Sequence, residues 1–583
     1  MSTAPVIPVG IDLGTTNSLI GALVDGKARL FADASGVELL PSVVGGGPSG
    51  ELYIGRAAKN RRLLDPQGTV VSVKRRMGTD VRLEVGRREL SPPQVSALIL
   101  GALLDRAEAA LGARPTRAVI TVPAYFGEAQ RQATRDAGAM AGLTVERLVN
   151  EPTAAALTYQ SGVEELVMVY DLGGGTFDVS ILERDEGLLE VRASRGDTHL
   201  GGDDIDRALS ELVLQRLGAA RGAVAGDPRA MTRIVEAAER AKIALSDKEE
   251  VRIFDPFLTG EGADAVHLDL ALTRADVEEV ARPFVARTLE HVDAALRDAG
   301  VKAGDPSRVL LVGGASKMPL VRRMLVTHLG RPVHVDLDAD RAVALGASIL
   351  AGRIGGADVD EVLIDITPHT LAFGIADRAY LEGDEGELAA KAIIPRDTVV
   401  PVERTQTVFT LLPDQEAAEL PIVQGERPRL SGNTRLGTVT VAPLPPGPAN
   451  APVEVTFRLD LSGVLHVRAV HVPSGRSADV HIADSPYQLA EVRRRSAGAE
   501  VAEMRRHASP ASGPAEGPSA SDLSLARAML GRAKRALEKE GGDEAARSRV
   551  RAMAAALGAA IEAREPGVMD RSDELSDALL DLI

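Results

Sequence analysis

The sequence predicts a multidomain protein in which a duplicated α/β unit is followed by an antiparallel β-sandwich and then by helices. Three observations predict this order. Two strand ends carry the same Asp-Leu-Gly pattern, at residues 9–18 and 167–180, which indicates a repeated unit with a cleft between its halves. Beyond residue 368, alternating strand patterns broken by Pro and Gly take over, as in a sandwich. Beyond residue 485 the pattern becomes helical and rich in Ala, Arg and Glu.

Length and composition restrict the class of protein. With 583 residues the chain is too long for one hydrophobic core, and its 45% apolar content excludes a mainly disordered protein. A net charge of −16 without basic tracts argues against nucleic acid or a membrane as a partner. The absence of Cys excludes disulfides, thiol catalysis and thiolate metal sites. Because neither a signal peptide nor a membrane-spanning stretch is recognisable, we expect a cytoplasmic protein.

The second Asp-Leu-Gly turn has the composition of a phosphate-binding loop. An apolar strand pattern ends near Asp171, and another resumes at Phe177 after three glycines. Glycines let the backbone turn tightly and approach a ligand, and their successive N–H groups can surround an anion. Asp171 and Asp178 add carboxylates and Thr176 adds a hydroxyl, a set that suits a metal-bound polyphosphate. Taken alone, the motif is equally compatible with a glycine-rich hairpin bearing surface acids.

Two further glycine turns argue against an isolated hairpin. The first follows Ile11-Asp12-Leu13 and contains Gly14, Thr15 and Thr16. Another strand-to-glycine turn runs over residues 309–316, with a proline near the start of the next helix. Repetition of one pattern at three strand ends predicts a shared ligand site in the cleft.

The first 357 residues alternate between strand and helix patterns. Residues 1–80 are predicted as strands and turns. Glu239, Lys242 and Ser246 share one face of a predicted helix, which by default is a solvated face. We predict helices over 95–111, 128–140, 227–246 and 273–299, and a buried strand over 118–123.

A short helix is predicted to begin at Pro152, because proline suits the first helical position. Glu151 precedes this proline and is therefore expected outside α geometry. Its carboxylate would lie at the helix N-terminus, close in sequence to the Asp171 turn. A simple capping role for Glu151 is the alternative.

The composition changes near residue 358. Strands are predicted over 406–411, 436–441, 453–459 and 463–470, and helices over 522–540, 543–564 and 570–582. A Ser-, Pro- and Gly-rich stretch at 509–520 predicts a flexible break in the helical part. The predicted boundaries are 1–357 for the duplicated unit, 358–367 for a linker, 368–484 for the sandwich and 485–583 for the helices.

These motifs resemble the 70-kilodalton heat-shock chaperone family, whose bacterial type is DnaK, over residues 6–484. They occur in the order of the family: Ile11–Asn17, Asn150–Ala156, Asp171–Asp178, Gly196–Gly202, Leu311–Gly314 and Gln424–Arg427. The resemblance implies an actin-like (ribonuclease H-like, duplicated) ATPase domain, a short linker, a β-sandwich that binds peptides and a C-terminal helical lid.

The resemblance also implies roles for individual residues. Mg²⁺, with K⁺ as a further candidate cation, would lie near Asp12, Asp171 and Asp178. Hydrolysis would depend on Lys74, Glu151, Asp171 and Thr176. ATP or ADP would contact Gly14, Thr15, Thr16, Asn17, Gly173, Gly174, Gly175, Gly201, Gly202, Glu239, Lys242, Ser246, Gly313, Gly314, Lys317 and Asp340.

Two more residue sets are implied outside the cleft. A relay between the domains would use Pro123, Arg131, Val362, Leu363 and Ile364. Peptides would contact Phe373, Ala376, Phe409, Leu412, Ala418 and Leu420. Ordinary core packing is the alternative for each member of the peptide set.

Several positions depart from the family pattern. Lys317 stands where the family has an arginine packed on adenine, and lysine cannot stack as a planar guanidinium does. The other departures are Asp203 in place of a glutamate, Arg341 in place of an acid beside Asp340, a linker run at 362–364 that is one residue short, and abbreviated segments after Lys74 and around 414–419.

The resemblance therefore implies an ATP-dependent chaperone of the stress response, which binds and releases extended hydrophobic segments of unfolded proteins. ATP binding would open the lid and loosen peptide binding, and hydrolysis would close it. A J-domain co-chaperone and a GrpE-type nucleotide-exchange factor are the implied partners. One alternative is a kinase of the same ATPase superfamily, but a kinase would need neither sandwich nor lid. Another is a non-hydrolysing peptide-binding scaffold, against which the intact hydrolytic residues argue. A filament-forming actin relative is the third.

Overall fold

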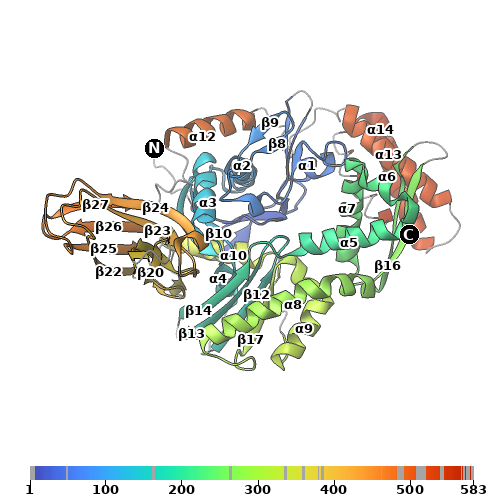
Figure 1. The fold of residues 1–583 in the computed structure, drawn as a ribbon. Helices are drawn as coiled ribbons and strands as arrows, with labels where there is room; N and C mark the ends of the chain where they lie inside the picture. Colours follow the sequence, from blue (N-terminus) through green and yellow to red (C-terminus); the bar gives the residue numbers. More distant parts are fainter. Residues whose placement is uncertain are drawn as a thin grey trace.

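The structure is a computed structural model (Figure 1). It describes residues 7–47, 50–159, 165–185, 187–260, 265–333, 338–357, 362–377, 380–381, 386–460, 463–481, 491–506, 520–538 and 544–565, together with residues 568, 571, 572, 575, 578 and 579. The predicted residues 358–361, most of the predicted break at 509–520 and most of the predicted helix at 570–582 lie outside the described residues.

The N-terminal sheet has the strand order β11-β10-β1-β2-β3, with β4 paired to β2. Its strands are β1 (Val9–Asp12), β2 (Asn17–Val24), β3 (Lys27–Leu30), β4 (Leu40–Pro41), β10 (Arg117–Val122) and β11 (Thr144–Asn150). Strands β1, β10 and β11 are parallel, so β1 and β10 end at the same edge of the sheet.

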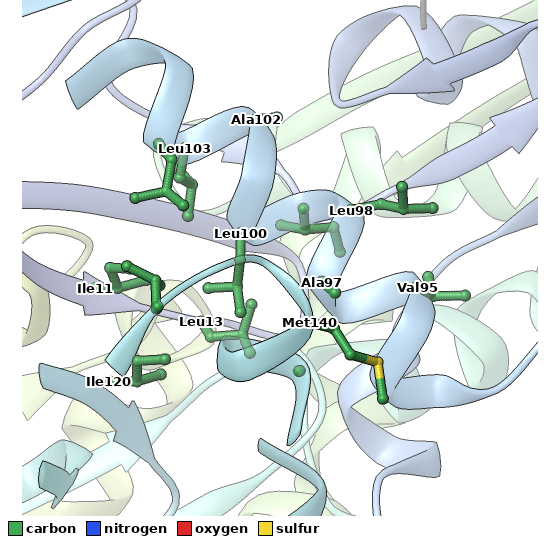
Figure 2. Packing of buried hydrophobic residues seen from close by; sticks show 14 of the residues in the cluster. Ile11, Leu13, Val95, Ala97, Leu98, Leu100, Ala102, Leu103, Ile120 and Met140 are labelled. Atoms are coloured by element: carbon green, nitrogen blue, oxygen red, sulfur yellow. The ribbon is translucent and has the colours of Figure 1, made fainter. Parts of the chain in front are cut away.

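Two helices cover one face of this sheet, α2 (Pro92–Leu111) and α3 (Glu128–Met140). Figure 2 shows Leu100 of α2 near Ile11 of β1, with Leu103 of α2 and Ile120 of β10 in the same buried cluster. Because α2 carries Leu and Ile on several sides of its axis, it is buried along most of its length. This packing fixes the strand end that bears Asp12.

The central sheet has the order β17-β12-β13-β14-β18-β21. Its strands are β12 (Glu165–Leu172), β13 (Phe177–Asp185), β14 (Leu188–Asp197), β17 (Arg308–Val312), β18 (Val362–Ile366) and β21 (Val399–Val400). Helices α8 (Arg274–Ala299) and α9 (Pro319–Leu329) cover its outer face. On the inner face, α4 (Glu151–Thr158) and α10 (Ala342–Ile354) form a buried cluster with residues from both sheets.

Smaller elements extend the two halves around the cleft. In the first half these are α1 (Arg56–Arg61), β5 (Val44–Gly46), β6 (Leu52–Ile54), β7 (Thr69–Val70), β8 (Leu83–Val85), β9 (Arg88–Leu90) and the 3-10 turn η1 (Val73–Arg76). In the second half they are α5 (Gly202–Arg216), α6 (Arg221–Ala225), α7 (Pro228–Ala244), β15 (Glu250–Thr259) and β16 (Val266–Thr273).

Residues 371–481 form a pair of facing sheets with one apolar core. One sheet is β20-β19-β23-β24, made of β19 (Leu371–Ile375), β20 (Ala389–Ile394), β23 (Ala418–Gln424) and β24 (Thr434–Val441). The other is β22-β25-β26-β27, made of β22 (Val402–Phe409), β25 (Pro452–Leu459), β26 (Leu465–His471) and β27 (Arg476–His481). We call this pair of sheets the sandwich.

The C-terminal helices occupy two separate locations on the molecule (Figure 1). Helix α12 (Glu491–Arg506) lies on α2 and α3, where Val501 and Met504 are buried in the core of the N-terminal half. Helices α13 (Ala520–Glu538) and α14 (Glu544–Ala563) share a separate core. Among the described helices, none combines the length and hydropathy needed to cross a membrane.

The structure corrects two local predictions. Residues 1–80 contain the helix α1 and the turn η1 as well as strands. Glu151 is the first residue of α4, with Asn150 as its extended N-cap, so Glu151 adopts helical geometry although proline follows it. An ion pair with Lys74 holds the Glu151 carboxylate at this end of α4. This interaction outweighs the modest preference of pre-proline residues for extended backbone.

Candidate functional site

A cavity of about 440 Å³ lies between the two halves, where the glycine turns of both sheets meet. The turn after β1 and the turn after β12 approach closely, because a Cβ on Gly174 would lie 2.0 Å from Thr16 Oγ1. The predicted residues that line the cavity are Asp12, Gly14, Thr15, Thr16, Asn17, Lys74, Glu151, Asp171, Gly173, Gly174, Thr176, Gly202, Glu239, Lys242, Ser246, Gly313, Gly314, Lys317 and Asp340. Gly175, Gly201 and Asp178 stand just behind this lining.

Three acidic side chains cluster at the cavity, with Asp12 and Asp171 in its lining and Asp178 behind it. Asp171 and Asp178 are paired across β12 and β13, and Asp12 ends β1. Asp12 accepts a hydrogen bond from Thr121 Oγ1 (3.0 Å), and Asp178 accepts one from the Tyr125 amide (3.0 Å). These contacts hold the Asp12 and Asp178 carboxylates in place.

The electrostatics of this cluster favour a cation. Burial, reinforced by the nearby Glu151 carboxylate, raises the pKa of Asp12 to about 7. The same two causes raise the pKa values of Asp171 and Asp178 well above their ordinary range. Among the described residues, no three His, Cys or acidic side chains converge closely enough to hold a metal ion directly. A divalent cation at these carboxylates would therefore be held largely through its own waters.

Lys74 and Glu151 form a buried ion pair beside these carboxylates, with exposed fractions of 4% and 7%. Lys74 is supplied by η1 and Glu151 by the first turn of α4. Burial by itself would lower the pKa of Lys74, but the Glu151 and Asp12 carboxylates outweigh it and raise that pKa. The lysine is thus a fixed ammonium group facing the glycine turns.

Another part of the cavity wall is formed by α7 and the turn that follows β17. Lys242 is buried and donates to Asp206 (2.8 Å), so the solvated face that is the default for such charges does not apply to Lys242. Glu239 faces Lys59 across the cleft at 3.5 Å. Lys317 forms an ion pair with Asp340, and both remain partly exposed at the cavity wall.

Four residues that support the site are not indicated by any of the sequence motifs: Thr121, Tyr125, Asp206 and Arg75. Thr121 and Tyr125 orient carboxylates, and Asp206 holds Lys242. Arg75 donates to the Gly175 carbonyl (2.8 Å) and pairs with Asp204 across the cleft. Only adjacency to Lys74 could have indicated Arg75, because its partners lie far away in the sequence.

The residues of the predicted relay lie along a path from α4 to the sandwich. Arg131 donates to Asn150 Oδ1 (2.6 Å), and Asn150 donates to both carboxylate oxygens of Asp365 (2.9 Å each). Pro123 is buried at the turn that leads to Tyr125. Val362, Leu363 and Ile364 add β18 to β14 in parallel register, and Leu363 is only 6% exposed.

The segment that contains the sandwich contacts the N-terminal half of the duplicated unit at further points. Gln424 accepts a hydrogen bond from the Glu128 amide at the start of α3 (2.9 Å). His369 donates from Nε2 to the Tyr125 carbonyl (3.1 Å), and their rings meet edge to face with centroids 4.5 Å apart. One residue, Tyr125, therefore connects the sandwich with the Asp178 carboxylate.

The predicted peptide contacts fall into two groups. Phe373, Ala418 and Leu420 belong to the sandwich core. Phe409 and Leu412 are exposed by 57% and 65%, beside the exposed Leu411, and Ala376 is partly buried just after β19.

Comparison with known proteins identifies the family. The family model described as Hsp70 protein matches residues 8–85 and 79–565. The chain belongs to the Hsp70 family. It is thus a chaperone of the Hsp70 class with a multidomain α/β fold. Members of this family are ATPases that bind nucleotide, generally with Mg²⁺, and work with unfolded clients and co-chaperones.

Proposed function

We propose that this Hsp70 protein hydrolyses ATP in the cavity between its halves and thereby controls peptide binding by the sandwich. The observation that carries the proposal is the meeting of two glycine turns, the Asp12 and Asp171 carboxylates and the Lys74–Glu151 pair in one cavity. That combination matches what phosphoryl transfer requires, namely positioning and charge stabilisation.

Each group has an assigned task. The amides at Gly14, Thr15, Thr16, Gly174 and Gly175 bind the phosphates. Hydrated Mg²⁺, when bound near the three carboxylates, neutralises charge that develops on the phosphoryl oxygens. The Lys74 ammonium stabilises the terminal phosphate, and Glu151, Asp171 and Thr176 orient the attacking water. K⁺ is a further candidate cation.

The proposal extends the sandwich and the lid to client binding. Exposed apolar residues near the β22–β23 connection, Phe409, Leu411 and Leu412, provide a surface for an extended hydrophobic peptide. Strand β18 pairs with β14 on one side and with β21 on the other, which supports its role as the coupler. The proposed partners are unfolded clients, a J-domain co-chaperone and a GrpE-type exchange factor in the cytoplasm.

The test combines two measurements on the full chain. We expect ATP addition to speed dissociation of a labelled Leu-rich peptide, and the same peptide to stimulate ATP hydrolysis. A chain that binds peptide without hydrolysing ATP would be a scaffold instead. Transfer of the terminal phosphate to an added small-molecule acceptor, without a peptide effect, would indicate a kinase.

A further inference from the structure

One wall of the cavity is built from a segment that the sequence motifs do not include. Leu39 lines the cavity together with Lys317, Asp340 and Val343. It belongs to the connection between β3 and β4, outside the three glycine turns of the sequence analysis. The segment reaches the start of α10, because Glu38, which precedes Leu39, forms an ion pair with Arg341.

Both ends of the segment that carries Leu39 are held in place. On one side, β4 pairs with Asn17 and Ser18, and Ser42 donates to the Gly14 carbonyl (2.8 Å). On the other side, Arg106 of α2 donates to the Glu38 carbonyl (2.7 Å). Leu39 therefore lies between the first phosphate loop and a second anchor.

That second anchor includes an ion pair over a long sequence separation. Arg341 Nη2 lies 2.8 Å from Glu38 Oε1. Arg341 is the N-cap residue of α10, where a cation is unfavourable beside the positive end of the helix dipole. Helix stability therefore gives no reason for an arginine at this position, whereas the contact with Glu38 does. Asp340, the neighbouring residue, lines the cavity.

From these contacts we propose that Leu39 binds the nucleoside part of the nucleotide and that Arg341, acting through Glu38, is its positioning residue. The inference rests on the proposed nucleotide function of the cavity. A flat purine base presents apolar faces, and Leu39 and Val343 offer apolar surface to them at a wall whose charged pair, Lys317 and Asp340, is largely self-neutralised. Apolar contact by Leu39 therefore supplies base affinity that the Lys317 side chain does not.

Calorimetry with ADP and with inorganic tripolyphosphate separates the nucleoside contact from the phosphate contacts. Leu39→Ala should weaken ADP binding about tenfold, since it removes most of one leucine contact. Binding of tripolyphosphate should not change, because it lacks a nucleoside. Leu39→Met is the matched control and should bind ADP as wild type does.

The positioning role is tested by a charge cycle. Arg341→Ala and Glu38→Ala should each raise the KM for ATP about threefold with little change in kcat, as expected for a partly exposed ion pair. The doubly exchanged protein, Arg341→Glu with Glu38→Arg, should recover most of the loss. Lack of recovery would overturn the role of the pair.

The remaining outcomes are distinct. Equal weakening of ADP and tripolyphosphate by Leu39→Ala would show general damage to the cleft and would overturn the nucleoside contact, as would unchanged ADP binding. If the wild-type protein bound neither ligand, the proposed function itself would fail, and this inference with it.

Discussion

Acidification should undock the sandwich from the duplicated α/β unit, and His369 should carry the response. The ring is packed against Tyr125 and donates to its carbonyl. A second proton on this ring would be placed near Arg131 and Arg195, with Glu426 as the opposing charge. The docked state therefore favours the neutral imidazole.

The magnitude follows from proton linkage. Burial, aided by Arg131 and Arg195, lowers the pKa of docked His369 from its ordinary value of 6.5, although the Tyr125 carbonyl and Glu426 act in the opposite direction. Above pH 6.5 both states are neutral and the His369 contribution to docking is fully present. Below 6.5 the undocked ring takes up a proton first, so docking weakens by up to about tenfold, or about 1.4 kcal/mol, per pH unit until the docked pKa is reached.

Other groups at the interface titrate with the opposite sign. Burial raises the pKa values of Asp365 and Glu128, so their protonation favours the docked state as the pH falls. A matched variant is therefore needed. His369→Gln keeps an N–H group that can reach the Tyr125 carbonyl but has no titration in this range.

The assay uses the absence of native cysteine. Fluorophores on Lys302→Cys and Val472→Cys, both at exposed positions, report docking by energy transfer between pH 8 and pH 5.5. Wild type should lose docking below pH 6.5, and the His369→Gln protein should not. Parallel curves for the two proteins would refute the role of His369.

The remaining predictions concern the cleft and β18. Thr176→Ala and Lys74→Ala should each abolish most hydrolysis while ATP binding stays measurable, because both residues lie at the phosphate end; wild-type single-turnover rates in both would contradict the assignment. Lys317→Arg should tighten ADP binding by about 1 kcal/mol, because the guanidinium can leave Asp340 and stack on the base. Calorimetry that shows weaker or equal binding would mean that residue 317 does not face the base. Leu363→Asp should retain basal hydrolysis and peptide binding but lose ATP-stimulated peptide release. The reason is that the substitution removes roughly 1.5–3 kcal/mol of apolar burial from β18. Peptide release that still responds to ATP would show that β18 only connects the domains and does not couple them.

Local signals in the sequence predicted much of the first half. Glycines and apolar alternation located β12 and β13, and the helix that begins after Thr273 ends as predicted at Gly300 in left-handed geometry. The Asp12 and Asp171 turns could be paired because they repeat one pattern. In each case the information lies within a short window of the chain.

Features set by distant contacts could not be obtained in this way. The Lys74–Glu151 pair joins residues 77 positions apart, and no periodicity indicates it. Phe373 and Phe409 look alike as apolar residues in strands, yet one packs in the sandwich core and the other is exposed, because burial depends on which sheet faces the strand. Glu151 was misjudged because a tertiary ion pair overrode a local backbone preference.

The position of β18 in the central sheet has a practical consequence for fragments of this protein. The strand closes the edge of β14 and brings β21, which lies between β20 and β22 in the chain, into the same sheet. A fragment cut at residue 357 would leave unpaired the N–H and C=O groups of β14 that face β18, and would uncover Leu189, which is fully buried in the intact chain. Such an exposed edge pairs readily with another chain. The isolated N-terminal fragment should therefore self-associate, and its solubility should be restored by extending it through Ile366.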